Sequence, residues 1–256
     1  MNPSDAIATR AKMQQLKVCT VMPTYNNAGT LRGVVEKVLS FCNDVIVVND
    51  GCTDDSAEIL ASFGDRITVV DYGKNRGKGY ALKQGFKKAK QKGFDYALTI
   101  DSDGQHFPED VPLFVNALEQ HTGALIVGSR NLNQENMPGG NTFANKFSNF
   151  WFKVQTGIDL PDTQTGYRLY PLRSLPHIFS ARYEAELSLL VFSAWRGIDL
   201  VPIKVNVCYP EDRVTHFRPF WDFFRISVLN TILCLVAIVY GWPSRLIRKM
   251  FRRKSV

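Results

Sequence analysis

Short apolar runs alternate with helical patterns over the first half of the chain. Apolar runs suited to strands buried in a sheet span residues 17–22, 45–48, 67–70, 96–100 and 124–127. Between them, apolar residues recur three and four positions apart, as at Leu31, Val34 and Val38, which is the spacing of one helix face. The predicted helices span residues 30–40, 54–63, 79–92 and 108–121, and Thr53 is positioned to cap the second of them. This alternation predicts an α/β fold with a mainly parallel sheet and helices on both faces.

The pattern loosens after residue 131 and then resumes. It predicts a helix over residues 143–156, a strand over 164–170, a helix over 184–196 and a strand over 201–207. Residues 226–242 then form an apolar run without a charged side chain. As a helix this run is about 25 Å long, which is at the short limit for crossing a hydrocarbon core of about 30 Å. A membrane helix and a buried core helix both fit such a run.

The flanks of the apolar run favour a membrane. Residues 216–225 interleave aromatic side chains with cations, a composition typical of the membrane interface. On the other side, Leu246, Ile247, Met250 and Phe251 recur at helical spacing among cations. We therefore expect the C-terminal segment to lie on a membrane.

The positive charge of the chain is concentrated at its C-terminus. The formal net charge is +7, from 31 Lys and Arg against 24 Asp and Glu. Residues 243–256 hold six of these cations and no acid, so the rest of the chain has 25 cations against 24 acids, a net of +1. A nucleic-acid-binding protein more often spreads cations over a folded face, so we expect no nucleic-acid partner. A basic tail after an apolar segment instead predicts contact with anionic membrane lipids.

The cysteines give an expectation about the compartment. There are five, with no CxxC spacing, which is typical of reduced thiols in a cytosolic setting. The N-terminus has no apolar stretch of the kind found in signal peptides.

Two carboxylates follow the strand predicted over residues 96–100. Asp101 and Asp103 stand two positions apart, so both can bind one hard cation such as Mg²⁺ or Mn²⁺ that also binds a diphosphate. Such a metal would stabilise the charge that develops on a leaving nucleoside diphosphate. The alternative is an acidic turn without a ligand, because Asp and Gly are common in turns.

Polar residues also follow two other predicted strands. Asp50 follows the run 45–48 and can accept a hydrogen bond from a base or a ribose hydroxyl, and Tyr25 follows the run 17–22 and can pack on a base. Ligands of parallel α/β sheets bind at the carboxyl ends of the strands. Taken alone, each of these two motifs is better explained by an ordinary turn after a strand.

The order of these motifs resembles that of glycosyltransferase family 2, an inverting family with the GT-A fold, and more closely its polyprenyl-phosphate branch, the dolichyl-phosphate mannose synthase type. The matching segments are residues 21–27, 47–56, 75–79, 99–110, 128–130 and 165–171, and the resemblance covers residues 16–207. It implies a GT-A catalytic domain over residues 16–210, an N-terminal extension over 1–15 and a membrane-associated segment over 211–256.

The resemblance also implies roles for single residues. Contacts to the nucleotide sugar fall on Pro23, Tyr25, Asn27, Asp50, Asp101, Gln105 and Arg213, and the divalent metal falls on Asp101, Asp103 and Gln105. Asp103, Arg130 and Arg168 are the implied catalytic residues. Arg130 resembles an arginine that meets the acceptor phosphate, and Arg168 is a second candidate for binding an anion. An ordinary surface ion pair is the alternative for either arginine.

Some positions depart from the family pattern. Asn27 stands where the family often has Glu, and Asn49 stands where it often has an acid, so the nucleobase stays open. Arg213 and His216 match the family's late basic element only loosely.

The resemblance predicts metal-dependent transfer of a sugar from a nucleotide sugar to a polyprenyl phosphate. A phosphate acceptor is already ionised, whereas a lipid or glycan hydroxyl would need a general base, for which Glu184 and Glu186 are candidates. Two alternatives are a catalytically silent membrane scaffold and a nucleotidyltransferase. The retained Asp101, Asp103 and arginines argue against the first, and the lack of a glycine-rich motif near the N-terminus argues against the second.

Charge also predicts the topology. Nucleotide sugars are cytosolic, so the catalytic domain is expected on the cytoplasmic face. One full crossing would place the six tail cations outside, against the positive-inside tendency. The prediction is therefore a monotopic or re-entrant anchor, with a single span as the alternative.

Three further features receive no site role. Lys83, Lys87, Lys88, Lys90 and Lys92 are expected to form a solvated helix face. The segment Gly77-Lys78-Gly79 matches neither phosphate-binding glycine motif. His106 and His177 lack metal-ligand spacing.

Overall fold

The protein is built around one mostly parallel sheet. The computed structural model describes residues 3–130, 139–178, 180–182, 184–208, 219–244 and 246. Within these residues, seven strands form a sheet in the order β3-β2-β1-β4-β6-β5-β7. The strands are β1 (Val18–Thr24), β2 (Val45–Asn49), β3 (Thr68–Asp71), β4 (Tyr96–Thr99), β5 (Leu125–Arg130), β6 (Arg168–Pro171) and β7 (Leu200–Val205). Strand β6 runs antiparallel to β4 and β5, and the other pairs are parallel.

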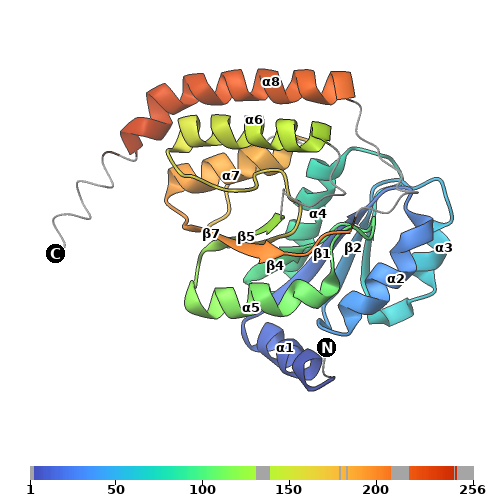
Figure 1. The fold of residues 1–256 in the computed structure, drawn as a ribbon. Helices are drawn as coiled ribbons and strands as arrows, with labels where there is room; N and C mark the ends of the chain where they lie inside the picture. Colours follow the sequence, from blue (N-terminus) through green and yellow to red (C-terminus); the bar gives the residue numbers. More distant parts are fainter. Residues whose placement is uncertain are drawn as a thin grey trace.

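Helices cover both faces of this sheet (Figure 1). They are α1 (Pro3–Gln15), α2 (Ala28–Leu39), α3 (Ser56–Ala61), α4 (Lys78–Gln91), α5 (Val111–Gln120), α6 (Gly139–Thr156), α7 (Glu184–Arg196) and α8 (Pro219–Val236), with the short elements η1 (Gly64–Arg66), η2 (Pro108–Asp110) and η3 (Ala237–Gly241). Helices α1, α2 and α5 contribute to the core on one face, and α4, α6 and α7 to the core on the other. Helix α8 lies outside α6 and α7.

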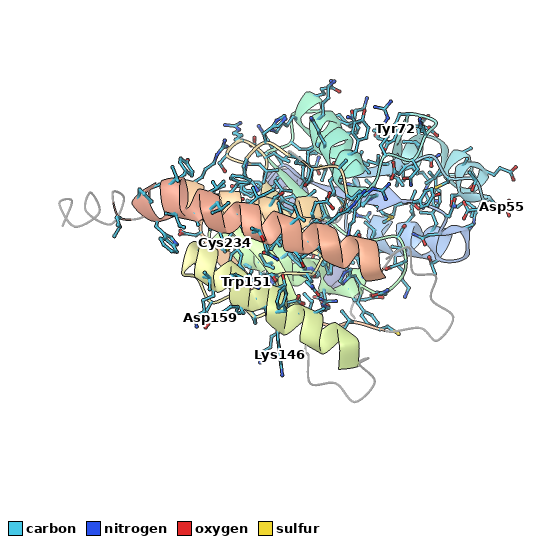
Figure 2. All side chains as sticks on the ribbon, turned by 90° about the horizontal axis from the view of Figure 1, so that it is seen from above. Asp55, Tyr72, Lys146, Trp151, Asp159 and Cys234 are labelled. Carbon is cyan, nitrogen blue, oxygen red and sulfur yellow. The ribbon has the colours of Figure 1, made fainter. Side chains whose placement is uncertain are left out.

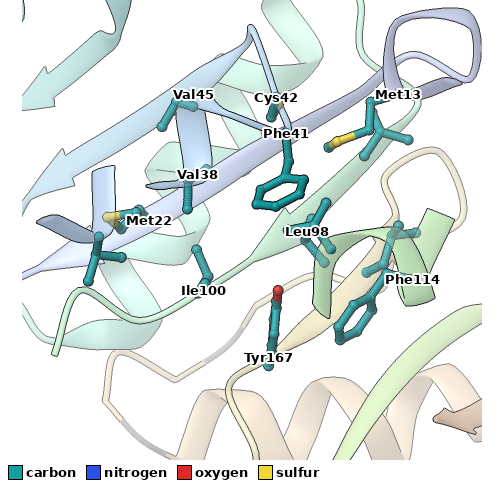
Figure 3. Packing of buried hydrophobic residues seen from close by; sticks show 14 of the residues in the cluster. Met13, Met22, Val38, Phe41, Cys42, Val45, Leu98, Ile100, Phe114 and Tyr167 are labelled. Carbon is teal, nitrogen blue, oxygen red and sulfur yellow. The ribbon is translucent and has the colours of Figure 1, made fainter. Parts of the chain in front are cut away.

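The central strands are apolar because both of their faces are covered. All residues of β1 and β2 are buried. Figure 3 shows part of the core under α1, α2 and α5, which includes Met22, Leu98 and Ile100 of the sheet side and Phe114 packed against Tyr167. The predicted α/β fold of the GT-A type, with a mainly parallel sheet covered on both faces, is confirmed.

Two local expectations were wrong. Helix α3 begins at Ser56 with Asp55 at its N-cap, so Thr53 does not cap it. Asp54 instead accepts hydrogen bonds from the backbone amides of Ser56 and Ala28, at 3.1 and 2.9 Å, which ties the start of α3 to the start of α2. The strand predicted over residues 164–170 begins only at Arg168, because amides of the preceding segment bond to nearby side chains: the Gln164 amide donates to Asp162 Oδ1 and the Tyr167 amide to Thr165 Oγ1.

Helix α8 continues into the π-helix η3 and forms a long apolar element. The stretch Arg225–Ser244 is long and apolar enough to cross a membrane by length and composition. In this structure it packs along α6 and α7 and places Asn230, Leu233 and Ala237 against them. Only a minor part of the stretch is buried.

Candidate active site

The carboxyl ends of three neighbouring strands bring the predicted motifs together. Thr24 at the end of β1 is level with Asn49 at the end of β2, and β4 ends beside β1. Side chains then link the loops that follow: Asn27 donates to Ser102 Oγ at 2.9 Å, and Ser102 donates to Thr24 Oγ1 at 3.0 Å. The segment with Asp101 and Asp103 is therefore fixed to the end of β1.

Asp50 organises the loop that precedes α4. It is buried, and its carboxylate accepts hydrogen bonds from the Tyr72 hydroxyl at 2.7 Å and from the amides of Arg76 and Gly77 at 2.8 Å each. Gly51 has a positive φ of 70°, and a side chain there would collide with the backbone of Lys74 and Asn75. Both carboxylate oxygens of Asp50 are thus used by the chain itself.

Lys78 occupies the centre of the site. Its Nζ lies 2.8 Å from Asp101 Oδ1 and 3.1 Å from Glu186 Oε2. Burial alone would lower the pKa of Lys78, but the two carboxylates outweigh burial and raise it. Gly166 lies against this ion pair, because a Cβ there would lie 2.7 Å from both Lys78 Nζ and Asp101 Oδ2, so these side chains would have to shift.

The pKa values of the two acids beside Lys78 are shifted in opposite directions. Burial favours the neutral form of both, but Lys78, His106 and Arg168 together lower the pKa of Asp101. Burial dominates at Glu186 and raises its pKa. A structural reason is that both Asp101 oxygens contact Lys78, whereas Glu186 Oε1 is buried without a hydrogen-bond partner in the described part of the chain.

Asp103 and Gln105 lie in a tight turn after β4. Asp103 Oδ1 accepts a hydrogen bond from the Gln105 amide at 3.0 Å, and Gly104 between them has a φ of 76°. No group of three His, Cys, Asp or Glu side chains that could hold a metal gathers in the described residues. Asp101 and Asp103 supply two carboxylates, a donor set that fits a hard cation whose other ligands are phosphate oxygens and water.

His106 is buried next to this turn. Its ring centroid lies 5.1 Å from that of Tyr167, and its Nδ1 has no hydrogen-bond partner among the described residues. Burial lowers the pKa of His106 to about 4, so the imidazole is neutral near pH 7.

Arg130 is held rigidly at the end of β5. Its Nε and Nη2 donate to the two oxygens of Asp162 at 2.6 and 3.0 Å, and Asn145 of α6 donates to the same carboxylate at 2.7 Å. Asp162 is completely buried, and Arg130 keeps 14% of its side chain exposed. Burial would raise the pKa of Asp162, but the bonds from Arg130 and Asn145 lower it. The guanidinium is therefore oriented before any ligand arrives.

Arg168 is completely buried at the start of β6 and its guanidinium bonds to the chain itself. It donates to the carbonyl oxygens of Glu186 at 2.6 Å and Thr163 at 2.9 Å. The anion-binding role implied for Arg168 has no support from this geometry. Arg168 instead positions the start of α7, and with it Glu186.

The remaining predicted residues fall at different depths. Pro23 is buried in β1, and Tyr25, Asn27 and Gln105 are partly exposed around the strand ends. Glu184 is also partly exposed, at the first residue of α7. Arg213 and His216 lie outside the described residues.

Lys78 is the central residue that sequence reasoning missed. A signal for it existed, because Lys78 is the first residue of α4, whose first turn holds no acid. A cation at a helix N-terminus opposes the helix dipole, which indicates a compensating partner. The lysines expected to be solvated behave as predicted, since Lys83, Lys87, Lys90 and Lys92 are exposed and Lys88 is partly exposed.

A mostly parallel sheet with acids and cations at its strand ends defines an α/β protein whose ligand site lies at those strand ends. The sequence profile of glycosyl transferase family 2 matches residues 19–179. The chain belongs to this family and is a glycosyltransferase.

The chain is similar in sequence to enzymes that transfer sugars to lipid phosphates. An undecaprenyl-phosphate mannosyltransferase of Micrococcus luteus is 29% identical over 209 residues, covering 75% of this chain and 83% of that protein. An undecaprenyl-phosphate 4-deoxy-4-formamido-L-arabinose transferase of Photorhabdus laumondii subsp. laumondii is 32% identical over 244 residues, covering 90% of this chain and 70% of that protein. The resemblance to the polyprenyl-phosphate branch is confirmed.

The fold matches a solved structure as well. Glucosyl-3-phosphoglycerate synthase from Mycobacterium tuberculosis, in complex with Mn²⁺, UDP and phosphoglyceric acid, superposes with a TM-score of 0.67 at 20% identity. The match covers 91% of this chain and 82% of that chain. At this identity the likeness concerns the fold.

Proposed function

We propose that this glycosyltransferase moves a sugar from a nucleotide sugar to a polyprenyl phosphate, with inversion at the anomeric carbon, at the cytoplasmic face of a membrane. The observation that carries the proposal is that the strand ends hold both a pair of carboxylates and a fixed guanidinium. Asp101 and Asp103 stand at the end of β4, and the guanidinium of Arg130 is held by a buried carboxylate at the end of β5. Acids suit a metal-bound diphosphate, and a fixed guanidinium suits a second phosphate.

The donor would bind across the ends of β1, β2 and β4. Tyr25, Pro23 and Asn27 are proposed to contact the nucleoside, and Asp50 acts by fixing the 72–77 loop and so the position of Lys78. Asp101, Asp103 and Gln105 would hold Mg²⁺ or Mn²⁺, which neutralises charge on the leaving diphosphate. A structural neighbour was solved with Mn²⁺ and UDP, which supports a divalent cation. Lys78 keeps Asp101 ionised, ready for that role.

The acceptor phosphate is proposed to meet Arg130. Asp162 and Asn145 fix the guanidinium, so little side-chain entropy is lost when a phosphate binds. Because a phosphate oxygen is ionised near neutral pH, it can attack the anomeric carbon without a strong general base.

A hydroxyl acceptor is the second candidate, and one observation favours it. Glu186 lies in the same centre as Asp101, and burial raises the pKa of its carboxyl, which makes it a stronger base. In that case Glu186 would take the proton from the attacking hydroxyl.

One assay separates these candidates. The purified full chain is incubated with Mg²⁺ or Mn²⁺, a panel of radiolabelled nucleotide sugars, and either a polyprenyl phosphate or the matching polyprenol. Label in the organic phase only with the phosphate supports the proposal. Transfer to the polyprenol, lost in Glu186→Gln, supports the second candidate, and label in neither arm with any donor contradicts the proposal.

A further inference from the structure

Helices α6 and α8 present one continuous apolar surface to the outside. Figure 2 views this side and shows the two helices next to each other. The α6–α8 surface consists of exposed apolar side chains, 39–81% accessible, namely Phe150, Val154, Val228, Ile232, Leu235, Ile238, Val239, Tyr240 and Trp242. A contiguous exposed apolar patch of this kind marks an interaction site on a soluble domain.

The opposite side of α8 is fixed to the domain. Asn230 and Gln155 of α6 are buried and bond to each other through Gln155 Nε2 and Asn230 Oδ1 at 3.0 Å. Gly241 packs on Trp195 of α7, and a Cβ at that position would lie 2.5 Å from the indole nitrogen. The Trp242 indole donates to the Val154 carbonyl at 3.3 Å. Contacts from Asn230 to Trp242 thus hold this part of the apolar stretch flat on the domain.

We infer that α8 is an in-plane membrane helix, and that α6 and α8 together form the face by which the enzyme lies on an anionic bilayer. The helix does not cross the membrane. This inference rests on the proposed function in one respect, namely that the acceptor is a membrane lipid.

The packing explains why the helix lies in the plane of the bilayer. If α8 stood upright in the membrane, it would have to leave α6 and α7, and the buried amides of Gln155 and Asn230 would lose their partners. An unpaired buried amide costs about 1–3 kcal/mol. If the domain stayed attached, the charged Lys153 and Asp159 at the edge of α6 would enter the hydrocarbon (Asp159 is labelled in Figure 2).

Charge identifies a bilayer as the occupant of the surface. Lys146 and Arg225 are exposed on α6 and α8, and the segment after α8, residues 245–256, adds six cations and no acid. Apolar side chains bordered by cations are typical of helices that lie in an anionic membrane interface.

The surface also leads toward the proposed acceptor site. Asn145 of α6 bonds to Asp162, which holds Arg130. Phe150, an exposed apolar residue of the surface, follows Asn145 by about 7–8 Å along α6. A lipid whose phosphate meets Arg130 would therefore have its chain close to the bilayer.

Vesicle binding tests the surface without any sugar transfer. The full chain is titrated with vesicles of phosphatidylcholine alone or mixed with phosphatidylglycerol, and bound protein is measured by flotation. Ile232→Asp with Leu235→Asp should weaken binding to the mixed vesicles on the order of tenfold per side chain. The charge-matched control is Ile7→Asp with Leu113→Asp, at exposed apolar residues of α1 and α5, which should change binding less than about twofold.

A depth measurement tests the orientation. The background protein has Cys52, Cys208 and Cys234 changed to Ser. A single cysteine is then placed at Val228, Leu235 or Val239 and labelled with a fluorophore, whose depth is measured by quenching with nitroxide lipids. An in-plane helix gives one shallow depth at all three positions. A spanning helix gives depths that differ by up to about 16 Å between Val228 and Val239, and that result overturns the inference.

Other results of these experiments would overturn either the inference or the proposed function. Equal vesicle binding by the Ile232/Leu235 variant and its control overturns the inference. If the same variant instead dissociates a dimer in sedimentation, the surface joins two copies of the chain and the inference is wrong. Vesicle binding as expected without transfer to any polyprenyl phosphate would contradict the proposed function and leave the membrane surface standing.

Discussion

Lys78 shows how one residue sets the charge state of the site. Its ammonium lies between Asp101 and Glu186, and all three side chains are largely buried. A buried ion pair contributes little net stability when intact, but removing one partner leaves a buried charge without compensation. The stability of the site should therefore depend on the balance of charges more than on any single contact.

A double-mutant cycle tests this balance. Lys78→Met should lower the free energy of unfolding by about 3 kcal/mol, because Asp101 and Glu186 then share a buried site without a cation. Adding Glu186→Gln should recover part of the loss, so that the two effects are not additive. Denaturant unfolding of the two single variants and the double variant measures the coupling. Lys83→Met, exposed on the same helix, is the control and should change stability by less than about 0.5 kcal/mol.

Asp103 is predicted to act in catalysis and not in folding. Asp103→Asn keeps the size of the side chain but removes a charge proposed to hold the divalent cation, so the rate of sugar transfer should fall on the order of a hundredfold or more. The melting temperature should stay close to that of the wild type. Transfer assays with and without EDTA, alongside thermal melts, measure both effects. Full activity of the variant in EDTA would rule out the metal site at this position.

The imidazole of His106 predicts a pH dependence of stability. Its pKa is lowered from 6.5 to about 4 by burial, so between these values the unfolded chain binds a proton that the folded chain does not. Stability should therefore fall as the pH falls through this window, by about 2 kcal/mol at pH 5 from this group alone. His106→Gln should remove that component. Denaturant unfolding of both proteins at pH 7 and pH 5 measures the difference, and an equal loss in both would contradict the assignment.

At the scale of helices and strands, the spacing of apolar residues predicted an element well where that element buries an apolar face in the core. The helix predicted over residues 184–196 has the observed bounds, and the apolar runs became β1 to β5 with small shifts at their ends. Helix α1 was not predicted, because it contacts the rest of the chain mainly through Met13, Thr9 and Ala6, too few apolar positions to set a period. The start of strand β6 was predicted too early, because local side-chain bonds to the amides of Gln164 and Tyr167 replace sheet pairing there.

Two glycines within helices give a matched test of packing. Gly85 of α4 faces the sheet, and a Cβ there would collide with Val21 Cγ1 and lie 3.1 Å from Val48 Cγ2. Gly85→Ala should lower the free energy of unfolding by about 1–3 kcal/mol, despite the better helix propensity of alanine. Gly33→Ala in α2 has nothing within 4 Å of the new Cβ and should raise stability by about 0.5–1 kcal/mol. Denaturant unfolding of both variants measures the contrast, and equal effects would mean that α4 can shift away from the sheet.

At the scale of the whole molecule, the site depends on contacts that local patterns do not contain. The sequence indicated Asp101 and Asp103 because they follow an apolar strand. It could not indicate that the antiparallel strand β6 brings Gly166 beside Asp101, or that α7 brings Glu186 to Lys78. The same limit applies to Arg168, whose motif suggests an anion site, because only the tertiary packing shows that backbone carbonyls occupy its guanidinium.

The distribution of charge over the whole molecule leads to the last prediction. Residues 1–242 carry a net charge of +1, and the six cations after them give the chain its +7. If α8 lies in the plane of the membrane, the chain does not cross it, and the cationic tail stays on the side of the catalytic domain. Ser255→Cys, in a protein with the exposed Cys208 changed to Ser, should then resist an impermeant thiol reagent added to intact cells. It should react once the membrane is permeabilised, which is the control for reactivity. Labelling from outside in intact cells would mean that Arg225–Ser244 spans the bilayer and that the tail is exported against the positive-inside tendency.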